Sequence, residues 1–159
     1  MAQLKDDCFA FGGELMPLDE ALAILAARIS PVTTPEPVAI SDALGRVLAA
    51  DVVAPMDVPP HDNSAVDGYA VRFSDLAGTG ETRLPVGGRV AAGHPLGRGQ
   101  RSGEAIRIFT GAPMPEGTDT VYMEEDCEVA GDAVIVPAGL AAGANRRLRG
   151  EDVQTGEVV

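Results

Sequence analysis

Residues 62–71 read Asp62-Asn63-Ser64-Ala65-Val66-Asp67-Gly68-Tyr69-Ala70-Val71, and they open the part of the chain that is patterned as short strands. Asp, Asn and Ser side chains bond to nearby backbone amides, and Gly68 admits backbone angles that other residues resist. The stretch therefore suits a structural turn that leads into a strand at Tyr69. The functional alternative is that its two carboxylates and its amide converge on a polar ligand or a hydrated cation.

Downstream of this stretch, the apolar segments are short and are separated by Gly or Pro. They predict strands at 84–86, 106–109, 121–123, 127–129 and 134–136. The residues between the last two, 130–133, suit a hairpin turn. Strands at this spacing indicate a small barrel or sandwich rather than β–α–β units.

Upstream, the pattern is helical. Pro17 suits a first helical turn, and apolar residues recur at helical spacing up to Pro31, which ends the helix. Ser41 is a good N-cap for a second, short helix through Leu48. Residues 1–15 show no clear periodicity, and we expect them to form a flexible leader.

The chain is strongly acidic. Lys and Arg number 12 and Asp and Glu 24, for a net charge of −12, so its surface repels nucleic acid and anionic membranes. We therefore expect neither as a partner. Cys8 and Cys127 form no CxxC pair, which fits a reducing compartment. Neither a signal peptide nor a bilayer-spanning run is evident, so the expected location is the cytoplasm.

Two further segments have residues suited to ligand binding. Within 107–117, Thr110 and the amide of Gly111 suit an oxyanion, although an ordinary strand-to-turn exit has the same composition. Within 145–152, three arginines suit phosphate recognition, whereas the alternative is a face of ion pairs with Glu151 and Asp152. The histidines lack ligand spacing, so no metal site is assigned within the chain.

The order of these segments resembles that of the molybdopterin molybdenumtransferases, the MoeA/gephyrin E-region family, from about Met16 onward. The resemblance rests on Asp-Asn-Ser-Ala-x-Asp-Gly-Tyr-Ala at 62–70, Thr-Gly-Ala-Pro-x-Pro-Glu-Gly at 110–117 and Asn-x-Arg-x-x-Gly-x-Asp at 145–152. It implies an enzyme that inserts molybdate into adenylylated molybdopterin and releases AMP, with Mg²⁺. It also implies a homodimer, and the molybdopterin-adenylylating enzyme of the same pathway as a partner.

The resemblance implies a domain organisation as well. Residues 16–54 and 144–159 would form an elongated first domain, and 55–143 a β domain inserted into it. The predicted fold class is α+β, mainly β: two short N-terminal helices plus an elongated β region, with an inserted small β-barrel or sandwich-like domain. The family's pterin-binding α/β domain and C-terminal barrel are expected to be absent, so the fragment is expected to be inactive alone.

Site residues carried over from the family fall into two groups. The catalytic candidates are Asp67, Thr110 and Asp152. The substrate-binding candidates are Asp62, Asn63, Ser64, Gly111 and Arg147. Asp67 would orient a water or a hydrated cation, and Thr110 would donate to an oxyanion.

The chain also departs from the family pattern, because Arg146 holds a position that is usually apolar. Which of Arg146, Arg147 and Arg149 faces the active-site cleft that the resemblance implies therefore stays open. The alternative function is a non-catalytic dimerisation or scaffold module of the gephyrin type.

Overall fold

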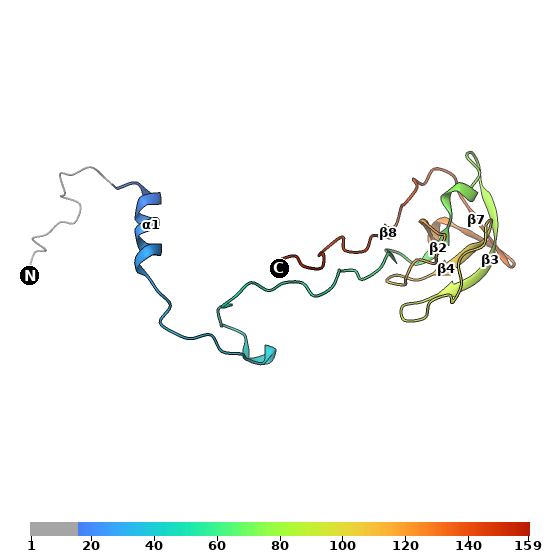
Figure 1. The fold of residues 1–159 in the computed structure, drawn as a ribbon. Coiled ribbons are helices and arrows are strands. Elements are labelled where there is room, and N and C mark those ends of the chain that lie inside the picture. The colour runs from blue at the N-terminus through green and yellow to red at the C-terminus, as the bar shows by residue number, and fades with distance from the viewer. Residues whose placement is uncertain (1–15) are drawn as a thin grey trace, which may run out of the picture. The chain divides into compact units, whose positions relative to one another are not determined.

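The computed structural model describes residues 16–159, which fall into two units divided between Ala49 and Ala50. The leader expected at 1–15 lies outside the described residues. In the part described, no helix has the length and apolar character needed to cross a membrane. Figure 1 shows the elements of both units.

The first unit contains helix α1 (Leu18–Arg28), as predicted. Pro17 directly precedes it, where a missing N–H costs nothing, and Asp19 and Glu20 lie in its first turn, where they complement the helix dipole. The helix ends before Pro31, because the residue before a proline disfavours helical angles.

The prediction of a second helix after Ser41 is wrong. The structure has only a single 3₁₀ turn there, Ile40–Asp42. Three residues further on, Gly45 has φ of 81°, in the left-handed region where a helix cannot continue. The chain therefore turns at this glycine and continues to Leu48 without helical structure.

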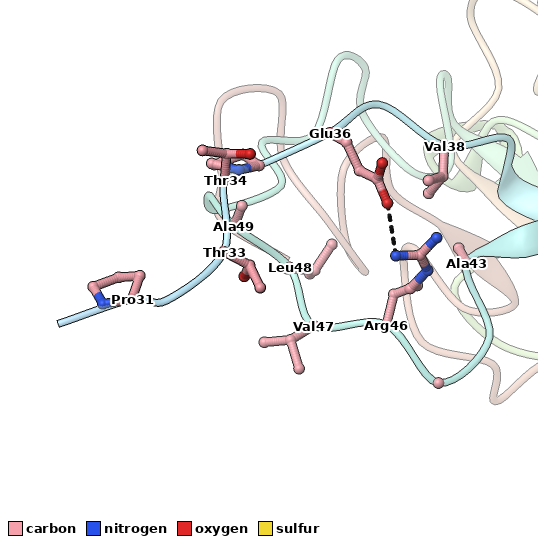
Figure 2. Close-up of a pocket in the computed structure, with 12 residues that line it drawn as sticks. Pro31, Thr33, Thr34, Glu36, Val38, Ala43, Arg46, Val47, Leu48 and Ala49 are labelled. Atoms are coloured by element: carbon pink, nitrogen blue, oxygen red, sulfur yellow. Dashed lines mark hydrogen bonds and ion pairs between the residues drawn. The ribbon is translucent and has the colours of Figure 1, made fainter. Parts of the chain in front are cut away.

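Apolar side chains of the first unit are largely exposed. No residue of α1 is buried, and Leu44 and Val47 are 98% and 93% exposed. Segments 31–38 and 43–49 enclose a hollow of about 800 Å³, shown in Figure 2. The ion pair between Glu36 and Arg46, at 2.8 Å, joins the two segments. This unit thus has no packed core among its described residues.

The second unit, residues 50–159, contains a curled, six-stranded sheet and a two-stranded ribbon. The sheet has the order β5-β2-β4-β3-β7-β6. Its strands are β2 (Gly68–Val71), β3 (Thr82–Val90), β4 (Ala105–Ile108), β5 (Thr120–Met123), β6 (Glu128–Ala130) and β7 (Ala133–Val136). The sheet is open, because its edge strands β5 and β6 do not pair with each other. The predicted hairpin is confirmed, since Ala130 pairs with Ala133.

Side chains alternate between the two faces of the sheet, and each face has its own apolar cluster. In β2, Tyr69 and Val71 belong to one cluster, together with Tyr122 and Val134. Ala70, between them, belongs to the other cluster, with Val90, Ile106, Ile108, Ala112 and Val121. Because successive side chains of β2 point to opposite faces and each face has its own cluster, this short strand is buried along its whole length.

The ribbon pairs β1 (Asn63–Ser64) with β8 (Arg146–Arg147). The pairing continues away from the sheet through isolated bridges that join Val58 to Val153 and Val53 to Val158. Figure 1 shows the two segments running side by side. The chain therefore enters and leaves the sheet at the same place, where the amide of Ala65 donates to the carbonyl of Asn145 at 2.9 Å.

Candidate functional site

Several strands meet at one end of the sheet. β2 begins at Gly68, which lies opposite Ile108 near the end of β4 and Met123 at the end of β5. β3 runs parallel to β4, so Val90 ends at the same place. Residues just outside these strands, although distant in sequence, are brought together there.

Asp67 and Thr110 are in direct contact at this end. The Oδ1 atom of Asp67 accepts hydrogen bonds from the Thr110 backbone N–H at 2.7 Å and from its hydroxyl at 2.8 Å. These two donors hold the pKa of the Asp67 carboxyl below its ordinary value, and the backbone N–H has the larger effect. The positive charge of Arg107 lowers this pKa further. Asp67 is exposed and is therefore a solvent-facing carboxylate at neutral pH.

The same contacts change the role that sequence suggests for Thr110. Its hydroxyl and its N–H both point at Asp67, so they hold the carboxylate rather than face a separate oxyanion. The amide of Gly111 donates to the carbonyl of Ser64 at 2.9 Å. Both donors proposed for an oxyanion are thus satisfied within the protein.

Arg107 lies beside this pair. Its guanidinium donates to the Gly68 carbonyl at 3.1 Å and forms an ion pair with Glu124, which directly follows β5. It also stacks over the ring of Phe109, with 4.6 Å to the ring centroid. Neither Arg107 nor Glu124 is among the site residues predicted from the sequence. The available signal was a charged residue between Ile106 and Ile108, on the opposite face from two buried side chains.

The polar residues in β1 and directly before it mainly fix the local backbone. Ser64 is 1% exposed, and its hydroxyl donates to the Val66 carbonyl at 2.5 Å. Asn63 pairs with Arg147 in the ribbon. Asp62 accepts a hydrogen bond from the backbone N–H of Arg149 at 2.8 Å. These contacts match the structural alternative for the stretch.

Arg147 and Asp152 form an ion pair with each other. Their side chains are 2.5 Å apart, and Glu151 also binds the same guanidinium at 2.8 Å. Hydrogen bonds to these two carboxylates raise the pKa of Arg147, and the arginine lowers that of Glu151. The ion-pair face considered from the sequence is therefore present. Arg146 lies 3.7 Å from Asp62.

The structure thus brings the three segments into one neighbourhood, but two pairs of side chains in it are not bonded to each other. The loop after β4 lies against β1, because the Met114 amide donates to the Asp62 carbonyl at 2.9 Å. Within residues 16–159, no hydrogen bond or ion pair joins the Asp67–Thr110 pair to the Arg147–Asp152 pair.

No metal centre is complete within the part of the chain that the structure describes, because no three His, Cys, Asp or Glu side chains are grouped suitably. Magnesium commonly uses one or two carboxylates together with substrate phosphates and water. The Oδ2 atom of Asp67 accepts no hydrogen bond from residues 16–159, so it is one oxygen donor of the required kind.

The relatives found by comparison with known proteins all point to one family. The model of the MoeA N-terminal region, domains I and II, matches residues 16–159. The molybdopterin molybdenumtransferase of Haemophilus influenzae is 40% identical over 146 residues, which are 91% of this chain and 36% of that protein. Molybdopterin molybdenumtransferase 2 of Mycobacterium tuberculosis is 38% identical over 132 residues, 81% of this chain and 32% of that protein.

The solved structures agree. The molybdopterin biosynthesis MoeA protein of Pyrococcus horikoshii superposes with a TM-score of 0.79 at 39% identity, over 92% of this chain and 39% of that one. The chain spans about a third of the length of its curated relatives. With the fold, the order of segments and the family match in agreement, the chain belongs to the family of the MoeA N-terminal region, domains I and II.

Proposed function

We propose that this chain is the N-terminal part of a molybdopterin molybdenumtransferase, which inserts molybdate into adenylylated molybdopterin and releases AMP. The chain would supply one wall of the reaction cleft, and the remaining wall would come from a part of the enzyme outside this sequence. The observation that carries the proposal is the Asp67 carboxylate, exposed and held by both donors of Thr110 at the end of the sheet.

In this proposal, Asp67 acts on the ligand and Thr110 positions it. A carboxylate with a lowered pKa stays ionised at neutral pH, so it can orient a water or a hydrated cation. Magnesium, when bound, would offset the negative charge of the phosphates, and the free Oδ2 atom of Asp67 fits its preference for oxygen. Arg147 and Asp152 contact each other, so their role would be to shape the neighbouring ribbon.

The test is AMP release from adenylylated molybdopterin with molybdate and magnesium, using this chain together with the C-terminal part of a related MoeA protein. Asp67→Asn is expected to lower turnover about 100-fold or more, because it removes the charge. Asp132→Asn is the matched control, since Asp132 is an exposed carboxylate at the far hairpin, with its side chain 95% exposed. Equal turnover of both variants would remove Asp67 from the site.

We further propose that 55–143 is a β domain inserted into a first domain made of 16–54 and 144–159. The bridge between Val53 and Val158, which joins the end of the first segment to the second, supports this division. A cytoplasmic location and the molybdopterin-adenylylating enzyme as partner belong to the same proposal, because both follow from the pathway.

The exposed apolar residues of the first unit favour a second candidate function, that of a dimerisation or scaffold module. Leu22 and Leu25 of α1 are 53% and 52% exposed. We propose that they lie in a homodimer interface, since burying such side chains stabilises association. Leu25→Asp should shift the chain toward monomer in light scattering, whereas Glu20→Gln on the same helix should not. A monomeric unmodified chain would contradict this second candidate.

A further inference from the structure

Four side chains form a row across one face of the sheet. Tyr122 of β5 pairs with Tyr69 of β2, Tyr69 with Arg107 of β4, and Arg107 with Arg89 of β3. Val90, next to Arg89, lies in the apolar cluster on the opposite face. Since strand side chains alternate, the two arginines lie on the face that carries the tyrosines.

Both arginines contact the same ring. The guanidinium carbons of Arg89 and Arg107 each lie 4.6 Å from the centroid of Phe109. Like charges directly opposite each other on neighbouring strands destabilise a sheet unless an anion compensates them. The arrangement therefore places two cations side by side, fixed in position by their strands and by one aromatic ring.

The two arginines differ in their compensation. Arg107 forms an ion pair with Glu124 and is partly buried, with 19% of its side chain exposed. Arg89 is exposed and, within residues 16–159, has no ion pair and no side-chain hydrogen bond. In a protein with a net charge of −12, Arg89 is thus a cation that forms no ion pair with the described residues.

We propose that Arg89 and Arg107, held by Phe109, form a binding site for a phosphate-class oxyanion. A guanidinium offers several N–H donors in a planar fork that matches two oxygens of a phosphate. Arg89 supplies the free donors, and Arg107 adds positive potential while it remains paired to Glu124. The carboxylates of Asp67 and Glu124 nearby limit the site to a small ligand bound at the Arg89 side. The site adjoins the Asp67–Thr110 pair, and binding to it is measured without turnover.

The experiment is titration of this chain with inorganic pyrophosphate, followed by calorimetry and by NMR of the arginine Nε–H signals. The signals of Arg89 and Arg107 are expected to shift. Arg89→Gln is expected to weaken binding about tenfold, because it removes a charge-assisted interaction from an exposed side chain without disturbing the core.

Arg83→Gln is the matched control. Arg83 lies on the same strand, β3, and is exposed; it donates to the Ala130 carbonyl at 3.3 Å and forms a long ion pair of 3.9 Å with Asp132. Its replacement removes the same charge from the chain, so unchanged affinity there together with the loss at Arg89→Gln supports a local site. The proposal is overturned if the unmodified chain does not bind pyrophosphate, if Arg89→Gln binds equally well, or if both variants lose affinity alike.

Discussion

Gly68 is the position at which one added methyl group should do most damage to the site. A Cβ there would lie 1.7 Å from the carbonyl oxygen of Tyr122 and 2.8 Å from its carbonyl carbon. Real Cβ atoms do not approach closer than 3.0 Å, so in Gly68→Ala strands β2 and β5 must separate by about 1.3 Å. Overpacking of this kind costs about 1–3 kcal/mol. Each weakened backbone hydrogen bond adds about 1 kcal/mol.

The expected loss is therefore about 3 kcal/mol, or a decrease in Tm of about 10 °C for a domain of this size. Urea unfolding followed by tyrosine fluorescence measures it, because Tyr69 and Tyr122 are both buried. Gly78→Ala is the control, since a Cβ there meets nothing within 4 Å and its φ is not in the left-handed region. The control should be neutral or more stable by up to about 1 kcal/mol. Equal unfolding midpoints for the two variants would refute the steric argument.

Three further replacements test the site, the ribbon and the core. Thr110→Val removes the hydroxyl donor but keeps the backbone donor, so the pKa of Asp67 should rise part of the way to its ordinary value in a carboxyl NMR titration; an unchanged pKa would contradict the pairing. Hydrogen bonds from Thr155 lower the pKa of Asp57 from 3.8 to about 2, so its contribution to stability is present above pH 3.8 and is lost as the pH falls through 2. The Tm difference between the unmodified chain and Asp57→Asn should therefore shrink across that interval, and a constant difference would argue against it. Ile106→Ala empties a fully buried position and should lower the free energy of unfolding by about 2–5 kcal/mol in urea titration, whereas a loss below about 1 kcal/mol would mean that the sheet can close around the gap.

Local patterns predicted most elements of the fold. Helix α1 was predicted because its spacing and its proline limits are both local in sequence. β3 was predicted at 84–86 but spans Thr82–Val90, because Gly87 and Gly88 lack side chains that could show a pattern. Its parallel pairing with β4 depends on contacts between segments distant in sequence, so no local pattern predicted it.

The sequence identified the segments that form the site, but it did not predict the contacts between them. The contact between Asp67 and Thr110 exists because β2 begins where β4 ends, and strand order decides this. Sequence also could not show that the Ser64 hydroxyl and the Gly111 amide bond within the protein. Arg89 belongs to no motif, and its relation to Phe109 arises only from the register of the sheet.

The ribbon has a consequence for the order in which the molecule folds. The hydrogen bond between Arg149 and Asp62 joins residues 87 positions apart, so closing it in an unfolded chain would carry a large entropic cost. Once the sheet has formed, the Ala65 amide already lies 2.9 Å from the Asn145 carbonyl, and the two segments begin side by side. The ribbon is therefore expected to form late in folding, with its strand pairing extending outward from the sheet. Its outer bridges, such as Val53 with Val158, should be the first to exchange their amide protons when the protein opens.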